Sequence, residues 1–284
     1  MIPAGPHGGD GARLAALLGI EVLDLSASLN PVAPDPAEIV GKHLDALGRY
    51  PDPSRATAAL AEAMGVDRDR LLLTNGGAEA IALVADAVGG GVVSEPEFSL
   101  HPRAAQGPRW RSNPNNPTGL LADGDADVWD EAFYALATGE WTAGRGGIVV
   151  GSLTKLFACP GLRLGYVLAD DVARFAARQP EWSLNGLAAE ALPDLLETAD
   201  LPGWQKRIAE LRTQLTALLA DFEPQPSDAN YVLCLRARGL RDRLAPHGVL
   251  VRDCTSFGLP DAVRVAVPNE AGLARLEEAL CAAG

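Results

Sequence analysis

The alternation of short apolar runs with helical segments over the middle of this chain constrains its fold more than any other feature. Residues 71–74, 92–95, 146–153 and 163–169 have the apolar character of strands. Helical periodicity is found at residues 37–47, 56–64 and 78–88. Strands separated by helices form parallel β-α-β units with right-handed crossovers. The predicted fold class is therefore α/β, with a mainly parallel sheet.

The two ends of the chain differ from this middle part. The first 36 residues are rich in proline and glycine around one short helix, so we predict an N-terminal arm at 1–36. Residues 37–192 form the predicted large domain. The remainder, 193–284, contains a long amphipathic helix, three strands and a final helix, which predicts a small α+β domain.

Charge and composition exclude several classes of protein. Asp and Glu number 37 against 24 Lys and Arg, giving a net charge of −13, which disfavours a nucleic-acid partner. The four cysteines are far apart and show no C-x-x-C pairing, so neither disulfides nor a metal site is predicted. We find no export signal or membrane span in the sequence, and expect a cytoplasmic protein.

One of the three lysines, Lys155, lies between two apolar strand-like runs, whereas Lys42 and Lys206 lie on amphipathic helices. Burial of an ammonium group is costly, so Lys155 either extends to solvent or is neutral and chemically employed, for instance as an imine to a carbonyl cofactor. Ser152 and Arg163 are close enough in sequence to clamp a phosphate beside it. The spacing alone leaves both interpretations open.

The segment containing these residues reads S-x-T-K-x-F-x-x-P-G-L-R-x-G-Y over 152–166. It resembles the cofactor-lysine motif of class I/II aminotransferases, the fold-type I pyridoxal-phosphate enzymes. The resemblance implies a large and a small domain, pyridoxal 5′-phosphate as cofactor, and Lys155 as the residue that binds it covalently. It also implies that Ser152 and Arg163 hold the cofactor phosphate.

Further motifs follow in the order of that family. SNPNNPTGLL implies that Asn116 bonds the phenolic oxygen of the cofactor, and WDEAFYAL that Asp130 pairs with the pyridine nitrogen. The glycine turn of LLLTNGGAEA implies phosphate binding by Gly77 and Ala78 at a helix N-terminus. EPEFSLH implies that His101 stacks on the pyridine ring.

Two other motifs concern the partner subunit and the substrate. RYPDPS resembles the segment whose tyrosine, here Tyr50, reaches the phosphate in the neighbouring subunit, which implies a homodimer. VRDCTSFGLPDAVRVAV resembles the segment whose last arginine, here Arg264, binds the substrate α-carboxylate; Arg252 is the candidate for a second anionic group.

The N-terminal residues narrow the resemblance. GPHGGD and LDLSASLNP resemble the openings of L-threonine-O-3-phosphate decarboxylases of cobalamin synthesis, which are related to histidinol-phosphate aminotransferases. This implies that His7, Gly8 and Asn30 line the pocket of a small phosphorylated amino-acid substrate. Relatives usually have additional strands and helices between Arg103 and Asn113 and between Gly119 and Asp130, so the large domain is expected to be shortened.

Three alternatives remain open from the sequence. The first is an aminotransferase of the histidinol-phosphate type, because the sequence does not determine which bond of the substrate is held perpendicular to the cofactor ring. The second is a non-catalytic pyridoxal-phosphate binder or partner protein, in view of the shortening. The third, a nucleotide binder using the turn at 75–77, lacks a magnesium-ligand or ribose-binding motif.

Overall fold

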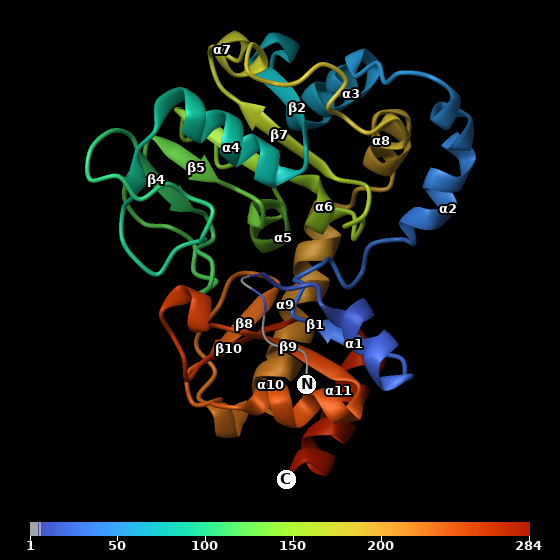
Figure 1. Ribbon diagram of the computed structural model, residues 1–284, viewed down its shortest axis with the longest axis vertical. Helices are drawn as coiled ribbons and strands as arrows, with labels where there is room; N and C mark the ends of the chain where they lie inside the picture. Colours follow the sequence, from blue (N-terminus) through green and yellow to red (C-terminus); the bar gives the residue numbers. More distant parts are fainter. Residues whose placement is uncertain (1–4, 6) are drawn as a thin grey trace.

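The computed structural model describes residue 5 and residues 7–284, and contains two β-sheets (Figure 1). In spatial order the large sheet consists of β2 (Leu71–Asn75), β7 (Leu164–Leu168), β6 (Ile148–Ser152), β5 (Val128–Asp130), β4 (Arg109–Ser112) and β3 (Gly91–Val92). Strands β3 to β6 are parallel, and β7 is antiparallel to both β2 and β6. The predicted α/β class with a mainly parallel sheet is confirmed.

The large sheet is covered on both faces, and its central strands β6 and β7 are buried along their whole length. On β6, Ile148 and Val150 pack in the cluster of α4 (Gly77–Val88), whereas Val149 packs on the opposite face. That opposite face is covered by α3 (Ser54–Met64) and α8 (Gly186–Glu197), which pack against each other (Figure 1). Both faces are therefore buried, as is usual for parallel sheets.

Apart from α4, the helices around this sheet are short, with the exception of α3 and α8. Their bounds are α2 (Pro36–Val40), η1 (Gly41–Gly48), α3 (Ser54–Met64), η2 (Arg68–Arg70), α5 (Tyr134–Thr138), α6 (Leu153–Leu156), α7 (Ala173–Ala176) and α8 (Gly186–Glu197). The helix predicted over 37–47 is divided at Gly41 into α2 and the 3-10 helix η1.

Two crossovers of the large sheet contain no helix. Residues 93–108 connect β3 to β4, and residues 113–127 connect β4 to β5, both as irregular loops. Parallel neighbours are usually joined through a helix, so these loops are where the predicted shortening is found. Neither β4 nor β5 was predicted, since RWRS and VWD are too short to show a strand period.

The small sheet has the order β1 (Leu23–Leu25), β9 (Val249–Asp253), β10 (Val263–Ala266) and β8 (Tyr231–Cys234). β1 is parallel to β9, and the other pairs are antiparallel. The elements around it are α1 (Gly11–Leu18), α9 (Leu201–Leu218), η3 (Ala220–Phe222), α10 (Leu240–Leu244), η4 (Ala245–His247), η5 (Thr255–Phe257) and α11 (Glu270–Ala283).

The N-terminal segment is more closely integrated than the predicted arm, of which residues 1–4 and 6 lie outside the described part. Leu25 on β1 belongs to the core of the small sheet, and Leu14 on α1 packs beside Leu250. The predicted boundary between 192 and 193 falls inside α8, and the domain limits stay a prediction.

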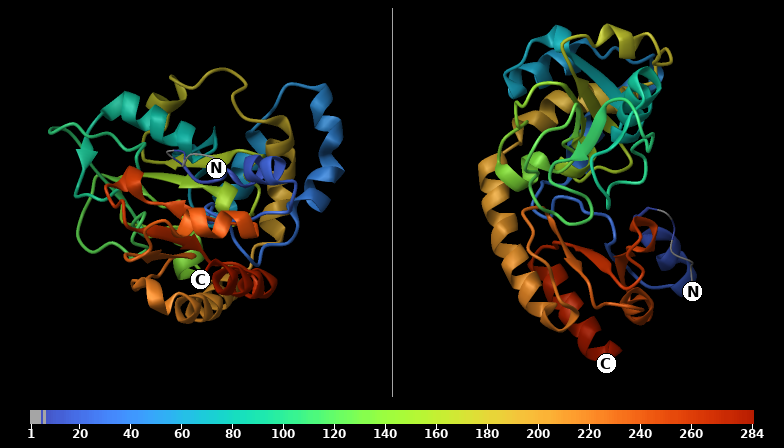
Figure 2. Two further views of the ribbon diagram at one scale, coloured as in Figure 1. Left: turned by 60° about the horizontal axis from the view of Figure 1, so that its bottom comes forward. Right: turned by 90° about the vertical axis from the view of Figure 1, so that its left-hand side faces the viewer.

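The long helix α9 runs along both units (Figure 2). Its first half places Trp204 and Ile208 in the core of the large sheet, and its second half places Leu211 and Leu215 in the core of the small sheet. One helix thus contributes side chains to the cores of both sheets and connects them. No helix among the described residues is long and apolar enough to cross a membrane.

Replacing Ile208 with alanine should lower the free energy of unfolding by about 2–5 kcal/mol, because its fully buried side chain would leave a cavity. Urea denaturation measures this. Lys206→Ala, at an exposed position on the same helix, should change it by less than about 0.5 kcal/mol. Equal losses in both variants would contradict the packing assigned to α9.

Candidate active site

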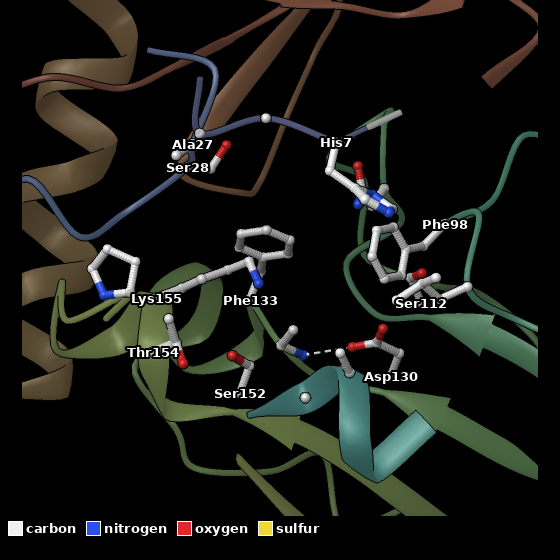
Figure 3. Close-up of a pocket in the computed structure, with 18 of the residues that line it drawn as sticks. His7, Ala27, Ser28, Phe98, Ser112, Asp130, Phe133, Ser152, Thr154 and Lys155 are labelled. Carbon is white, nitrogen blue, oxygen red and sulfur yellow. Dashed lines mark hydrogen bonds between the residues drawn. The ribbon is translucent and has the colours of Figure 1, made fainter. Parts of the chain in front are cut away.

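A cavity of about 360 Å³ lies between the two sheets. The ends of β5 and β6, α6 and the start of α4 form one side of it. The N-terminal segment and the strands β9 and β10 contribute to the other side. Figure 3 shows Lys155, Ser152 and Asp130 near the large sheet, with His7, Ala27 and Ser28 across the cavity.

Lys155 lies on the single turn of α6 that follows β6 and lines the cavity. Its ammonium nitrogen Nζ lies 5.0 Å from the centre of the Phe133 ring. Burial lowers the pKa of Lys155 to about 8, with smaller contributions from the charges of Arg264 and Arg163, and the carboxylate of Asp130 opposes this shift. The amine is therefore partly neutral near neutral pH, as a nucleophile requires.

The first turn of α4 presents backbone to the cavity opposite Ser152 and Arg163. Gly76 has φ +79°, and a Cβ atom there would lie 2.4 Å from Nη2 of Arg163. A Cβ atom on Gly77 would lie 3.2 Å from Cβ of Ser152. Gly77, Ala78, Ser152 and Arg163 all line the cavity. A helix N-terminus that begins with two glycines and faces a hydroxyl and a guanidinium suits a phosphate group.

Asp130 ends β5 and borders the cavity with a buried carboxylate. Its Oδ1 accepts a hydrogen bond from the backbone N–H of Ala132 at 3.0 Å, and its Oδ2 lies 3.0 Å from Nε2 of His101. Burial raises the pKa of Asp130, but the hydrogen bond and charge of His101 outweigh burial, so the pKa is lowered overall. Asp130 therefore stays ionised.

His101 is not among the side chains that line the cavity in the described part of the chain. Its ring is buried behind Asp130, where the carboxylates of Asp130 and Glu97 attract its two nitrogens. The structure thus gives His101 a different position from the one expected of a stacking residue. Phe98, three residues earlier in the same motif, lines the cavity instead.

Asn116 and Arg264 are in direct contact at the cavity wall. Nη1 of Arg264 donates a 2.5 Å hydrogen bond to Oδ1 of Asn116, and Nη2 donates to the carbonyl oxygen of Ser26 at 3.3 Å. The guanidinium also lies 4.7 Å from the centre of the Tyr231 ring. Nε of Arg264 is buried without a hydrogen-bond partner among the described residues. A cation held by neutral groups is available to an anionic ligand.

Arg252 lies directly across from Arg264 in the register of β9 and β10 and also lines the cavity. It donates hydrogen bonds to the carbonyl oxygen of Gly5 at 2.8 Å and to Oγ of Ser256 at 2.7 Å. His7 and Gly8 reach the cavity from the N-terminal segment. Burial and, to a lesser extent, the charge of Arg252 lower the pKa of His7.

Besides His101, two predicted site residues lie away from the cavity. Asn30 is buried, but its side-chain amide donates to the carbonyl oxygen of Leu156 at 3.0 Å. Its backbone N–H donates to the carbonyl oxygen of Lys155 at 2.9 Å. It therefore holds α6 in place and does not line the pocket. Tyr50 is 75% exposed and stacks on Trp182, so its predicted contact with a neighbouring subunit stays a prediction.

Phe98, Phe133 and Ser28 are among the cavity residues that were not predicted. Both phenylalanines belong to motifs quoted above, and their aromatic side chains next to the predicted contacts were the available signal. Ser28 gave none, because isolated serines are common in loops. Its buried hydroxyl lacks a hydrogen-bond partner in the described structure, which makes it available to a ligand.

The chain matches the family described as aminotransferase class I and II over residues 110–280. It is also 31% identical to the threonine-phosphate decarboxylase of Salmonella typhimurium, over 96% of each chain. The chain therefore belongs to the class I and II aminotransferase family. The shared alignment runs over 351 positions, more than the 284 residues of this chain, so it contains gaps, in agreement with the shortening.

Two further comparisons agree with this membership. The histidinol-phosphate aminotransferase 1 of Dechloromonas aromatica is 29% identical over 94% of this chain and 92% of its own. The structure of the histidinol-phosphate aminotransferase from Sinorhizobium meliloti, in complex with pyridoxal-5′-phosphate, superposes with a TM-score of 0.79 at 19% identity, over 99% of this chain and 95% of that one. The fold is thus that of the fold-type I enzymes, and this protein is an enzyme that depends on pyridoxal 5′-phosphate.

The chemistry of the cavity fits that cofactor. A buried amine with a lowered pKa, an ionised carboxylate and a helix N-terminus that begins with glycine border one space. These groups match the aldehyde, the ring nitrogen and the phosphate of pyridoxal phosphate. Among the described residues, no group of three or more His, Cys, Asp or Glu side chains could hold a metal ion.

Replacing Gly76 with alanine should weaken pyridoxal-phosphate binding about tenfold or more, because the new Cβ would displace the guanidinium of Arg163. The Kd from an absorbance titration measures this. Gly89→Ala, at the other end of α4, has a comparable positive φ of +64° but open space around it. It should leave the Kd unchanged, and equal weakening in both variants would show that backbone strain alone is responsible.

The rate at which the cofactor-free protein combines with pyridoxal phosphate should rise with pH around pH 8, because only the neutral amine of Lys155 reacts. An ordinary lysine would give this rise near about pH 10.4. Stopped-flow absorbance across the pH range measures the profile. A rise that begins only above pH 9.5 would contradict the burial of this amine.

Proposed function

We propose that this enzyme removes the α-carboxylate of L-threonine O-3-phosphate as carbon dioxide, giving (R)-1-aminopropan-2-yl phosphate for cobalamin synthesis. The observation that carries the proposal is the pair Arg252 and Arg264, which are buried cross-strand partners on one wall of the cavity. The similarity to the decarboxylase of Salmonella typhimurium supports it.

Two cations in one buried wall favour a substrate with two anionic groups. L-threonine phosphate carries a carboxylate and a phosphate on a short carbon skeleton, whereas histidinol phosphate carries a phosphate but no carboxylate. A guanidinium binds either group through paired hydrogen bonds. Within the described residues the hydrogen-bond acceptors of Arg264 are neutral oxygens, so an incoming anion meets little competition there.

In this proposal Lys155, Ser152, Arg163 and the first turn of α4 hold the cofactor, and Asp130 faces its ring nitrogen. Pyridoxal phosphate, when bound, withdraws electrons from the α-carbon of an amino-acid substrate. The two arginines orient the substrate's anionic groups. Lys155, whose pKa of about 8 lets it both donate and accept a proton near neutral pH, supplies the proton that replaces carbon dioxide at the α-carbon.

An aminotransferase acting on histidinol phosphate is the second candidate, because a relative with that name is nearly as similar. There Lys155 would move the α-proton instead, and the arginines would bind the phosphate and the keto acid.

The proposed assembly is a homodimer in the cytoplasm. The exposed pair Tyr50 and Trp182, whose ring centres lie 4.6 Å apart, supports a dimer contact at that surface.

Incubation with L-threonine phosphate should release carbon dioxide without an added keto acid, and histidinol phosphate should give no keto-acid-dependent product. Isotope release and mass spectrometry of the products measure both reactions. Carbon dioxide release, or amino-group loss, that occurs only with a keto-acid acceptor would favour the aminotransferase. Lys155→Ala should abolish either reaction.

Replacing Arg252 with glutamine should lower kcat/KM for L-threonine phosphate about ten- to a hundredfold, since a hydrogen bond from a charged group contributes about 1.5–3 kcal/mol. Steady-state kinetics measure the change. Arg238→Gln, at an exposed arginine paired with Asp261, is the control and should leave kcat/KM unchanged. An Arg252 variant as active as the control would contradict the assigned anion site.

A further inference from the structure

Behind Asp130, a second carboxylate is buried that no motif and no substrate contact explains. The side chains of Glu97 and His101 are 1% and 0% exposed, and they lie in line with Asp130, whose side chain is 10% exposed (the labelled Asp130 is shown in Figure 3). Water is therefore excluded from the contacts between these three groups. Burying a charged carboxylate costs free energy of folding unless the charge is paired, so the presence of Glu97 at this place requires an explanation.

The imidazole of His101 lies between the two carboxylates. Its Nε2 is 3.0 Å from Oδ2 of Asp130, and its Nδ1 is 3.5 Å from Oε2 of Glu97. No hydrogen bond at Nδ1 is made within the described structure, so the contact with Glu97 is an ion pair at longer range. The ring of His101 also packs against Trp110 and, edge to face, against Phe98, and neither of these side chains carries a charge.

Glu97 is held firmly in this position. Its Oε1 accepts a hydrogen bond from the backbone N–H of Ser112 at 2.8 Å, and its Oε2 accepts one from the hydroxyl of the same residue. Ser112 is in register with Asp130 on the neighbouring strand. The guanidinium of Arg103 donates to the carbonyl oxygens of Glu97, Phe98 and His101, which fixes the loop that carries both residues.

The charge on the imidazole follows from this arrangement. A neutral imidazole donates from only one nitrogen, so it would direct a lone pair at one of the two buried carboxylates. The doubly protonated ring donates toward both. Although burial opposes the charge, the two carboxylates together raise the pKa of His101 to about 9. The other charges near the ring are Arg103 on its own loop and Lys155, which interacts with Asp130.

We propose that Glu97 is a positioning residue that keeps His101 doubly protonated, so that His101 always donates to Asp130 and holds its carboxylate ionised and in one orientation toward the cofactor. Without the charge of Glu97, the imidazole could lose its proton and adopt the tautomer that withdraws the donor from Asp130. The part of this proposal that concerns the cofactor rests on the role proposed above for Asp130.

The test is the titration of His101 in wild type and in Glu97→Gln, followed by NMR on the full chain with and without pyridoxal phosphate. The chain has four histidines, so loss of one signal in His101→Gln assigns the resonance. In the wild type the ring should stay doubly protonated up to about pH 9. In Glu97→Gln its proton affinity should fall at least about tenfold, and Glu97→Asp should restore part of it.

The matched control is Glu95→Gln. Glu95 lies on the same loop, pairs with Arg103 and accepts a hydrogen bond from the backbone N–H of Glu97 at 2.8 Å. Its side chain is exposed and makes no contact with His101 in the described part of the chain, and glutamine keeps an acceptor oxygen. It should leave the titration unchanged. A second readout is the pH dependence of the visible absorbance of bound pyridoxal phosphate, which should change in Glu97→Gln and not in the control.

Two results would overturn the proposal. One is a His101 titration that is the same in Glu97→Gln as in the wild type, while only the thermal stability falls. Glu97 would then serve only as the hydrogen-bond acceptor of Ser112. The other is a wild-type His101 that titrates below about pH 7, a result that does not depend on the folding of Glu97→Gln. Neither readout depends on turnover, so a failed assay with threonine phosphate leaves this test intact.

Discussion

The burial of one primary amine beside one carboxylate is the interaction on which the rest of the site depends. Lys155 is removed from water, which favours its neutral form, while Asp130 keeps its charge through His101. As a result the amine of Lys155 can react and the carboxylate of Asp130 stays ionised. Asp130 ends β5, and Lys155 follows the neighbouring strand β6. The cavity needs both, since either group alone would be a buried charge without a chemical use.

The scaffold around this pair tolerates a reduced large domain. The two helix-free crossovers leave intact β5, β6 and α4, which carry Asp130, Ser152 and the glycine turn. In the shortened region, the loop at 93–108 is held by side-chain hydrogen bonds, mainly those of Arg103 and Glu97. The same loop thus closes the sheet edge and supports the carboxylate of the active site.

Much of this could be predicted from the chain, because the motif around Lys155 and the glycine turn are local. Their spacing determines which groups lie together once β6 and α4 form. His101, Asn30 and the N-terminal segment were less predictable. His101 is far from Asp130 in sequence, and only the pairing of β4 with β5 brings its loop behind that carboxylate. A position in a motif does not determine the direction of a side chain.

The sequence by itself determined the α/β class, through periodicity, and the family, through the short motifs around Lys155. It also predicted Lys155 as the residue that binds the cofactor. The tertiary structure decided which side chains face the cavity and which lie behind it. It joined β1 to the small sheet, placed Arg252 opposite Arg264, and buried Glu97 against His101. These contacts link distant segments, and the free energy of burying their charges depends on neighbours that only the folded chain brings together.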